Sequence, residues 1–493
     1  MYTKNMIGFP LWLQITHFLN IILMTLLARS GLQILADHPK LYWNDDTTPG
    51  SEWIKFGKKV MPKDELWTSI DEAEYINPIL GITGGNHNLG SARRWHFFAA
   101  ILFVANGLTY VTLLFVTGQW VRLVPTSWSI FPAAFNNLVE YLSFRIPPAS
   151  SFTPYDPLQQ LTYFAVVFIF APFMVFTGLA LSPALAGRFP WYIKIFGGRQ
   201  AARSLHFLGL VGIMGFLVIH LLLVALVNGR ANLLNITLGG PSGDWNLAVA
   251  IFSAAIVFTI LLNIWITWYT LHHQRKVQNA LDPFINFFTR LLSRMPSRQH
   301  YAKKDISPYF RVNGRPPKDE KWQHLAKNNF KDWKLNVGGL VKNKLALSLD
   351  DLRTSFSKSE QITKHNCIQG WSAVAEWGGV PVAELIKRAE PLPNARYIVF
   401  HAFDKDDQGL EYYTSYTIEE MMMPQSLLAY EMNGQPLPIV YGAPLRVRAE
   451  SRLGFKMVKY LKSMEFIADR KEVGSGYGGY RDDVQFFDNV ATI

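Results

Sequence analysis

The chain is poor in cysteine and in charge. Its 493 residues include one cysteine, which excludes a disulfide framework, a cysteine-held iron–sulfur cluster, a four-cysteine zinc site and a CxxCH haem attachment. Charged residues make up 17% of the chain and hydrophobic residues 49%, whereas soluble domains carry about 25% charged residues. This composition excludes a disordered or collagen-like chain and disfavours an ordinary soluble enzyme. A metal would need histidine, carboxylate, methionine or the single thiolate as its ligand.

The hydrophobic residues are concentrated in five segments of the first half. A helix needs about 20 apolar residues to cross a bilayer, and each segment has that length. Arg29, the one charge in the first segment, lies near its end, where the side chain can snorkel toward the interface. We expect an all-α membrane domain of five helices over residues 1–271, with tryptophan and tyrosine at the helix ends. The five segments are 9–35, 95–117, 158–182, 205–227 and 247–271.

The second half has a different character. Residues 272–305 are basic with an apolar stripe that includes Phe284, Phe287 and Leu291, which fits a helix in the membrane interface or a solvated linker equally well. From residue 306 the short runs RYIVFHAF, APLRVRAE and SMEFIAD are separated by Gly/Pro turns, a pattern typical of strands. The sequence therefore predicts a soluble, strand-rich α+β domain over residues 306–493.

Four histidines, His17, His96, His206 and His220, lie in or at the ends of the apolar segments. His206 and His220 share one predicted helix. Their spacing of fourteen residues corresponds to a rise of about 21 Å along the axis and to a rotation about 40° short of four full turns. They therefore face nearly the same side at two depths, as two stacked haems require. Because successive spans alternate in direction, we pair His17 with His220 and His96 with His206. A lone membrane histidine is more often an interhelix hydrogen-bonding group, and that alternative stays open for each of them.

The same segments resemble a known family. WLQITHFLN, HPKLYW, RRWHFFAAILFVANGLTY and GGRQAARSLHFLGLVGIMGFLVIH are similar to the di-haem cytochrome b subunits of respiratory hydrogenases, formate dehydrogenases and thiosulfate reductases, over about residues 8–230. The resemblance implies two b haems with axial ligands His17, His96, His206 and His220. It also implies exchange of electrons with membrane quinone or quinol.

Cys367 lies in the polar segment ITKHNCIQGW. A lone cysteine is usually a small buried hydrophobic residue, but this one is set in a turn and is a soft ligand suited to a redox metal. A nucleophilic cysteine is the alternative, since His365 or His401 could act as its base.

The surrounding sequence resembles the molybdenum-thiolate loop of the sulfite oxidase superfamily, with Ile368 and Gln369 in place of the usual Val-Glu. The likeness extends to ISPYFRVNGRPP, YEMNGQPLPIVYGAPLRVRAESRLGFKMVKYLKSMEF and GSGYGGYRDD. It implies that Cys367 binds molybdenum carried by molybdopterin, with Asn313 beside the reacting centre. Arg448 and Arg452 are candidates for binding a sulfite-like substrate. The residues implied to contact the pterin are Arg311, Asn313, His365, Cys367, Arg446, Gly454, Phe455, Lys456 and Lys459.

Together the two halves predict a membrane-bound molybdopterin oxidoreductase that moves electrons between a small substrate and the quinone pool through two b haems. The substrate is sulfite-like or an S- or N-oxide, and the direction is open. The alternative is a non-catalytic di-haem cytochrome whose soluble domain binds a partner. We expect the lipid bilayer, quinone, a small-molecule substrate and a possible soluble redox partner to interact with the chain, but no nucleic acid.

The location predicted is a bacterial-type plasma (inner) membrane, crossed several times. The side that carries the soluble domain is contested. Lysine and arginine are more frequent on the side of the soluble domain, and the positive-inside rule then places that domain in the cytoplasm. The cytochrome family implies an N-terminus inside and a periplasmic soluble domain. We favour the periplasm and keep the cytoplasm as the alternative.

Overall fold

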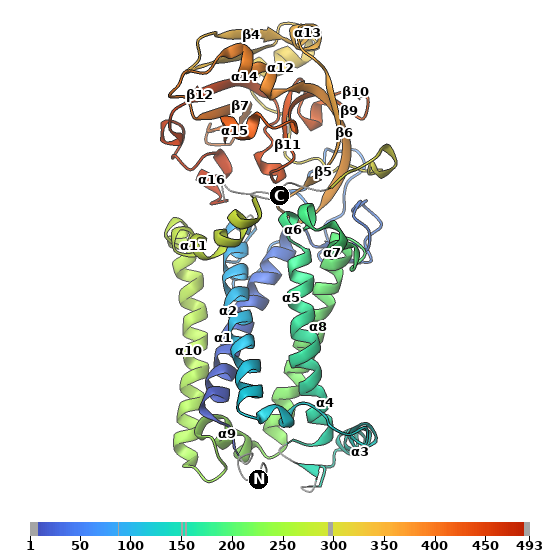
Figure 1. Ribbon diagram of the computed structural model, residues 1–493, viewed down its shortest axis with the longest axis vertical. Coiled ribbons are helices and arrows are strands. Elements are labelled where there is room, and N and C mark those ends of the chain that lie inside the picture. The colour runs from blue at the N-terminus through green and yellow to red at the C-terminus, as the bar shows by residue number, and fades with distance from the viewer. Residues whose placement is uncertain (1–7, 87, 149–150, 153–154, 294–298, 488–493) are drawn as a thin grey trace.

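The computed structural model describes residues 8–86, 88–148, 151–152, 155–293 and 299–487. A bundle of long helices stands below a strand-rich domain, and the N-terminal end lies at the far end of the bundle (Figure 1). The helices are α1 Leu11–Asp37, α2 Leu89–Val116, α3 Ile130–Leu142, α4 Pro157–Ala165, α5 Ala171–Ala180, α6 Pro183–Arg188, α7 Pro190–Lys194, α8 Arg199–Leu226, α9 Gly229–Leu238, α10 Trp245–His272, α11 Gln274–Ser293, α12 Glu320–Lys327, α13 Leu349–Thr354, α14 Val382–Ala389, α15 Ile418–Met421 and α16 Tyr480–Val484.

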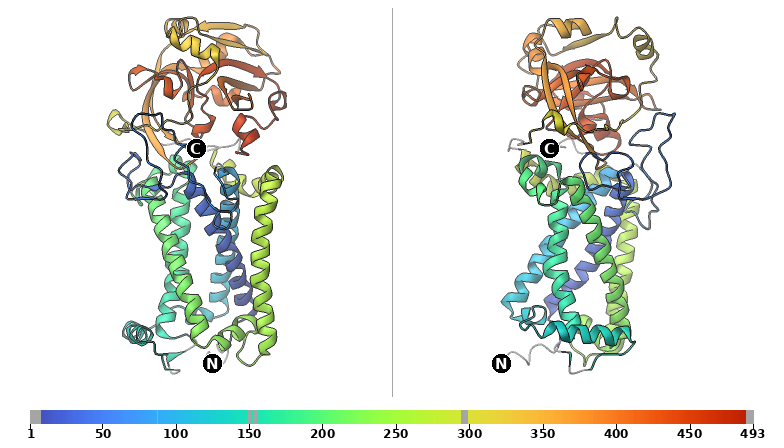
Figure 2. Two further views of the ribbon diagram at one scale, coloured as in Figure 1. Left: turned by 180° about the vertical axis from the view of Figure 1, so that it is seen from behind. Right: turned by 90° about the vertical axis from the view of Figure 1, so that its right-hand side faces the viewer.

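Among the described residues, five helical segments are long and apolar enough to cross a membrane, as predicted. They are α1, α2, the segment Pro157–Ala180, α8 and α10, and the third combines α4, the π-helical stretch Val166–Phe170 and α5. Successive spans run in opposite directions, so that α10 ends beside the soluble domain (Figure 2). Two spans begin earlier than expected, at Leu89 and Arg199, because their polar first turns are covered by other parts of the protein and need no lipid.

Arg29 makes a set of hydrogen bonds near the end of α1. Its guanidinium donates to the carbonyls of Ile79, Pro78 and Gly81 at 3.1, 2.7 and 2.9 Å. It also donates to the side chains of Asn263 and Thr267 on α10, both at 2.8 Å. A planar guanidinium can serve several acceptors at once. Arg29 therefore fastens a loop and a second helix to α1.

The soluble domain contains two five-stranded sheets. One has the order β10-β9-β6-β5 with β11 paired to β9, and the other has the order β4-β3-β12-β7-β8. All pairings are antiparallel except that of β12 with β3. The predicted runs at 396–403, 443–450 and 463–469 overlap β7, β11 and β12. The strands are β1 Lys40–Leu41, β2 Ile54–Lys55, β3 Lys334–Gly339, β4 Leu345–Ser348, β5 Ser359–Asn366, β6 Ser372–Pro381, β7 Tyr397–Lys405, β8 Glu411–Thr417, β9 Ser426–Met432, β10 Gln435–Pro436, β11 Arg446–Ala449 and β12 Leu461–Ile467.

Two connections bring the halves together. The helix α11 lies across the top of the bundle (Figure 1), with Phe284 and Phe287 exposed as an interfacial helix would have them. The segment between α1 and α2, which carries the small sheet β1–β2, reaches up beside the soluble domain (Figure 2). This second connection matters for the site described below.

We predict that Arg29→Met destabilises the protein by about 1–3 kcal/mol, because it leaves several partly buried acceptors without a donor. The midpoint of thermal unfolding in detergent should fall. Arg230→Met is the control, since Arg230 stacks over Trp245 at the far end of the bundle and its loss should shift the midpoint much less. Equal midpoints for Arg29→Met and the unaltered protein would contradict the role assigned to Arg29.

Candidate functional site

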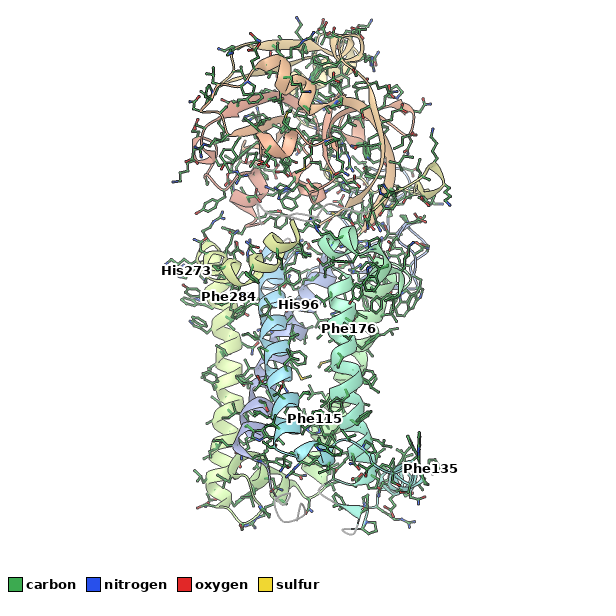
Figure 3. The ribbon with its side chains drawn as sticks, in the orientation of Figure 1. His96, Phe115, Phe135, Phe176, His273 and Phe284 are labelled. Carbon is green, nitrogen blue, oxygen red and sulfur yellow. The ribbon has the colours of Figure 1, made fainter. Side chains whose placement is uncertain are left out.

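The four membrane histidines form two pairs. The ring centres of His17 and His220 are 6.4 Å apart, and those of His96 and His206 are also 6.4 Å apart. A metal bound between two imidazole nitrogens at about 2 Å from each separates the ring centres by about 6 Å. Both gaps therefore suit one metal ion between two rings. Figure 3 labels His96 in the half of the bundle nearer the soluble domain, whereas His17 is near the start of α1 at the opposite end.

Hydroxyl groups orient three of these rings. Nδ1 of His96 lies 3.0 Å from Ser30 Oγ, Nδ1 of His206 lies 3.0 Å from Thr177 Oγ1, and Nδ1 of His220 lies 3.4 Å from the Tyr163 hydroxyl. A partner on one ring nitrogen fixes the ring and leaves the other nitrogen for a metal. Sequence reasoning did not identify these hydroxyl residues, because nothing in the local sequence links them to a histidine on another helix.

The surroundings of the pairs fit a haem better than a bare metal ion. Among the described residues, no group of three or more His, Cys, Asp or Glu side chains could hold a metal ion, and a porphyrin supplies the four ligands that a histidine pair lacks. Gly107 on α2, which lies on the same helix face as His96, has open space beside it, since an added Cβ would meet no atom within 4 Å. A flat macrocycle needs such open space beside the helices.

Cys367 lines a cavity in the soluble domain of about 970 Å³, its open mouth included. The structure brings most of the predicted pterin residues to its wall. It adds residues that the prediction lacked, from the membrane domain (Asp37, Ile70 and Leu89) and from the soluble domain (Asp404, Tyr412 and Arg481). The predicted residues in the wall are Arg311, Asn313, His365, Cys367, Arg446, Gly454, Phe455 and Lys459.

Three predicted residues are not in the wall of this cavity. The buried ammonium of Lys456 forms an ion pair with Asp482. The guanidinium of Arg452 pairs with Glu420, with Nη2 2.8 Å from Oε2. Arg448 lies fully buried behind His365 and donates to its Nδ1 and to Thr363 Oγ1, both at 3.0 Å. The expectations that Lys456 lines the pterin pocket and that Arg448 and Arg452 meet the substrate are therefore corrected.

Arg448 fixes the protonation of His365. Because a guanidinium can only donate, Nδ1 of His365 is the acceptor and Nε2 carries the proton. Burial holds the pKa of His365 well below its usual range, and the charge of Arg448 adds to this. Nε2 of His365 and Nε of Arg446 are buried and have no hydrogen-bond partner among the described groups. Both residues line the cavity, so they offer donors of the kind that pterin and phosphate acceptors would satisfy.

Burial also sets the charge of the cavity. It raises the pKa of the Cys367 thiol to about 12, so a metal must replace the proton for the thiolate to form. It lowers the pKa of Lys459 to about 7, with nearby Arg446 adding to the effect. An anionic ligand would raise the pKa of Lys459 again.

The turn after Cys367 rests on the start of α8. Gln200 Nε2 donates to the Gly370 carbonyl at 2.7 Å, and Arg199 Nη1 lies 3.4 Å from Asn366 Oδ1. Gly370 has a φ of +112°, and a Cβ there would lie 3.6 Å from the guanidinium of Arg203. A glycine suits this backbone conformation. His206 follows Gln200 on the same helix at a rise of about 9 Å, so the thiol turn and the upper histidine pair are attached to one rigid element.

The comparisons with known proteins agree with this architecture. The chain has the arrangement of a cytochrome b domain followed by a molybdopterin-binding domain. Residues 8–240 match the family model of the prokaryotic cytochrome b561, and residues 323–473 match that of the oxidoreductase molybdopterin binding domain. The chain is thus a cytochrome b561 domain fused to a molybdopterin-binding domain of the sulfite oxidase type, which confirms both resemblances drawn from the sequence.

Among curated proteins, the chain is 34% identical over 151 residues to a putative protein-methionine-sulfoxide reductase subunit YedZ1 of Azospira oryzae, covering 31% of this chain and 53% of that protein. It is 34% identical over 173 residues to the protein-methionine-sulfoxide reductase catalytic subunit MsrP of Xanthomonas axonopodis pv. citri, covering 32% and 52%. The chain therefore spans about half the length of each. The sulfane dehydrogenase SoxCD of Paracoccus pantotrophus matches 30% of this chain and 42% of its own at 22% identity, with a TM-score of 0.26, which supports no argument.

We predict that the stability of the cofactor-free, full-length chain rises between about pH 7 and pH 10 through Lys459. Below pH 7 the amine of Lys459 is protonated in both the folded and the unfolded chain. The free-energy cost of burying the ammonium then lowers the stability of the folded chain by its full amount. Above pH 7 the unfolded chain binds more protons at this group than the folded chain, so stability rises by up to about 1.4 kcal/mol per pH unit. Thermal unfolding of Lys459→Met across this range should show a smaller rise.

Lys462→Met is the control, because Lys462 on the neighbouring stretch of β12 is partly exposed and pairs with Glu411 at 2.8 Å. Its pH profile should parallel that of the unaltered chain. A Lys459→Met profile with the same slope as the unaltered chain would contradict the prediction.

Proposed function

We propose that this protein takes electrons from membrane quinol through two b haems and uses them to reduce a small S-oxide at a molybdenum centre. The observation that carries this proposal is the contact between the Cys367 turn and the start of α8, the helix that also bears His206 and His220. In the sulfoxide reaction the S–O bond breaks, two electrons and two protons are consumed, and a sulfide and water form. Quinol oxidation supplies the two electrons, and the two protons are taken up from water on the side of the soluble domain.

In this proposal His96 and His206 are the axial ligands of the haem nearer the soluble domain, and His17 and His220 are those of the other haem. The matched ring separations and the hydroxyl partners on Nδ1 support this assignment. The distant haem is near the opposite membrane surface, where quinol would have to deliver electrons. The two haems would then lie one above the other along α8.

Cys367 would hold molybdenum, and the pterin would occupy the cavity lined by His365, Arg446 and Lys459. Molybdenum held in this way supplies two-electron oxygen-atom chemistry, which the protein's own side chains cannot perform. His365 donates from Nε2, Arg446 and Lys459 offer cationic donors, and Gly454 lets the His365 ring approach the backbone, since any side chain at residue 454 would overlap it.

Two observations favour an S-oxide over sulfite. Arg448 and Arg452, the arginines expected to bind sulfite, have other partners. The relatives are named protein-methionine-sulfoxide reductase subunits, which supports sulfoxide as the reacting group.

A periplasmic soluble domain also remains our proposal. The positive-inside rule opposed it because of the arginines on that side of the membrane. In the structure several of these arginines serve contacts with the soluble domain and neighbouring loops. Arg94 pairs with Asp282, Arg275 donates to the Asp482 carbonyl, and Arg203 donates to the His38 and Lys40 carbonyls. The number of arginines on this side therefore reflects their contacts with the soluble domain and neighbouring loops. It is a weak guide to which side of the membrane carries the soluble domain.

Metal analysis tests the proposal first. We expect about one molybdenum and about two iron atoms per chain, from one thiolate site and two bis-histidine sites.

His220→Ala should remove about one iron and abolish quinol-driven turnover, while molybdenum and turnover driven by a reduced viologen persist. His272→Ala, at an exposed position at the end of α10, is the control and should keep both iron atoms. Loss of molybdenum with both haems retained would refute the assignment of His220, and iron without molybdenum would favour the non-catalytic cytochrome.

We further predict that Gln200→Met slows electron transfer between the two sites. Methionine matches glutamine in length but cannot donate to the Gly370 carbonyl. In stopped-flow experiments with methionine sulfoxide, reoxidation of the reduced haems should slow by about tenfold, the scale of effects on metal sites from groups beyond the ligands. Viologen-driven turnover should stay within about twofold, since it bypasses the haems.

Gln278→Met is the matched control for this experiment. Gln278 on α11 also lies against a carbonyl of the soluble domain, with Nε2 3.5 Å from the Phe487 oxygen, but at a contact that does not involve the Cys367 turn. Its haem reoxidation should remain at the rate of the unaltered protein. Equal slowing of haem reoxidation in both variants would show that the loss of any contact between the two domains slows electron transfer. This result would contradict the specific role of Gln200.

A further inference from the structure

The segment between α1 and α2 contains a short loop that enters the helical bundle. Ile82, at the inner end of this loop, is fully buried. It packs in one cluster with Leu26 of α1, Ala99 of α2 and Ile266 of α10. Leu26 lies eleven residues before the end of α1, and Ala99 lies ten residues after the start of α2, which is about 15–17 Å along each helix. The loop therefore carries a side chain down between three membrane spans.

The partners of Arg29 on α10 show how deep the loop lies. The same guanidinium that binds three loop carbonyls also donates to Asn263 and Thr267. These residues lie nine and five residues before the end of α10 at His272, about 14 and 8 Å along the axis. With 28 residues, α10 is about 42 Å long, so about 6 Å extends beyond each side of a hydrocarbon layer about 30 Å thick. The loop carbonyls are therefore level with the outer part of that layer.

The backbone of the loop tip finds its hydrogen-bond partners within the protein. The amides of Leu80 and Gly81 donate to the Asn77 carbonyl at 2.9 and 2.8 Å. The Ile79 amide donates to Asn77 Oδ1 at 2.8 Å. The carbonyls of the tip accept from Arg29. Irregular backbone is tolerated at membrane depth where its polar groups are satisfied without water, and these groups meet that condition.

The side chains of the tip, in contrast, are apolar and uncovered. Ile79 is 78% exposed and Leu80 57% exposed, and residues 75–82 contain no charged residue. Trp265 and Trp268 on α10 are exposed near the same level, as the aromatic side chains of a membrane interface are. The tip thus continues the lipid-facing surface of α10.

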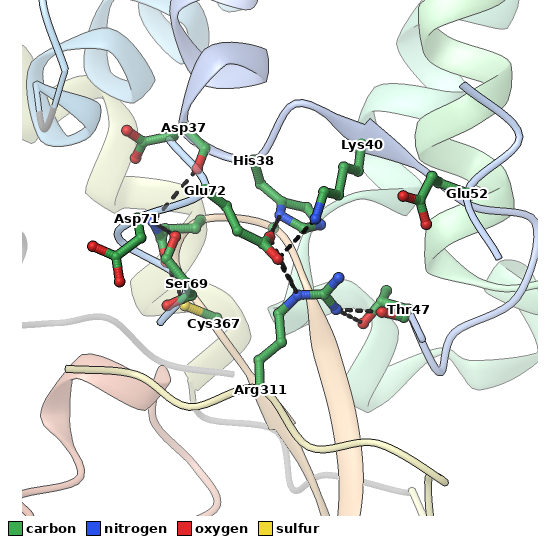
Figure 4. A network of polar contacts seen from close by, with 12 residues as sticks. Asp37, His38, Lys40, Thr47, Glu52, Ser69, Asp71, Glu72, Arg311 and Cys367 are labelled. Carbon is green, nitrogen blue, oxygen red and sulfur yellow. Dashed lines mark hydrogen bonds and ion pairs between the residues drawn. The ribbon is translucent and has the colours of Figure 1, made fainter. Parts of the chain in front are cut away.

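The part of the segment just before the loop is fixed as well. The Glu72 carboxylate lies 2.9 Å from Lys40 Nζ and 3.1 Å from His38 Nδ1, both of which follow α1. It also lies 3.3 Å from Arg311 Nε of the soluble domain (Figure 4). Removing one partner from a buried set of charges leaves the others uncompensated, which is costly. The loop is therefore held in place at its start by this cluster and at its tip by Arg29.

We propose that residues 76–82 form a re-entrant loop whose tip, Ile79 and Leu80, inserts between the lipid acyl chains on the soluble-domain side of the membrane. Three observations select lipid over a protein partner. They are the depth of the loop, its continuity with the exposed surface of α10 and a backbone satisfied without water. Arg29 is then the residue that keeps the loop at this depth. The inference concerns the membrane contact of the chain and is independent of the proposed function.

Spin-label accessibility tests this inference. Ile79→Cys is introduced into the full-length protein, labelled with a nitroxide and placed in vesicles of phosphatidylethanolamine and phosphatidylglycerol. Collisions of the label with oxygen, which concentrates in lipid, are compared with collisions with a polar nickel complex, which stays in water. We expect the ratio of oxygen to nickel collisions to be about fivefold or more higher at residue 79 than at residue 410, because polar groups are excluded from the apolar layer.

Leu410→Cys is the matched control, since Leu410 is an apolar side chain, 48% exposed, between β7 and β8 of the soluble domain. Leu261→Cys, at a position 59% exposed on α10, gives the reference for lipid. The unaltered protein should take up little label, because Cys367 is 1% exposed. Equal ratios at residues 79 and 410 would place the tip in water. Low collision rates with both reagents at residue 79 would show that protein covers the tip, and either result would overturn the proposal.

A second measurement needs no label. In the same vesicles, combining Ile79→Asp with Leu80→Asp should lower the midpoint of thermal unfolding by about 3 °C or more, because charges are costly in the apolar layer. The matched control combines Met422→Asp with Met423→Asp, two neighbouring apolar side chains that are exposed on the soluble domain. The control should leave the midpoint nearly unchanged. Equal shifts in the two double variants would overturn the insertion of the tip.

Discussion

The contact between the Cys367 turn and α8 determines how the two halves of this protein work together. Gln200 holds the Gly370 carbonyl, and the same helix continues to His206 and His220. A helix is a rigid spacer with a fixed rise and rotation per residue. The distance between the thiol and the upper histidine pair is therefore set by α8 and does not depend on the linker between the domains. The covalent connection through α10 and α11 leaves the opposite side of the bundle, where α11 makes its own hydrogen bonds to the soluble domain.

The junction is built from buried polar groups, which explains why it has one arrangement. Arg311, Glu72, Lys40 and His38 are all buried together, and Arg203 donates to the carbonyls of His38 and Lys40 at 2.6 and 2.8 Å. Unlike an apolar surface, such a network is satisfied in one geometry, and a shifted docking would leave charges and carbonyls unpaired. The cost of misplacement keeps the Cys367 cavity and the two histidine pairs in register across two domains of different fold.

The corrected residues show why charge on its own was a poor guide to the site. Arg448, Arg452 and Lys456 lie within a short basic stretch that sequence reasoning assigned to substrate or pterin. Lys456 and Arg452 each pair with a carboxylate, Asp482 and Glu420, from elsewhere in the chain. Arg448 instead supports His365 from behind and determines which of its nitrogens carries a proton. Arg29 is a similar case, since its partners are carbonyls and side chains from a loop and from α10 that local hydropathy cannot indicate.

The sequence by itself determined the five spans, the strand-rich soluble domain, the four histidines and the single thiol. These features depend on local composition, on helical periodicity and on motifs a few residues long. The alternating direction of the spans also predicted which histidines lie side by side, because it sets the depth of each histidine in the bundle. Only the tertiary structure decided that Asp37, Ile70 and Leu89 enclose the Cys367 cavity, that Gln200 supports its turn and that Ser30, Thr177 and Tyr163 orient the imidazoles. Each of these contacts joins residues far apart in the chain, and their positions follow from the packing of whole domains, which no local pattern records.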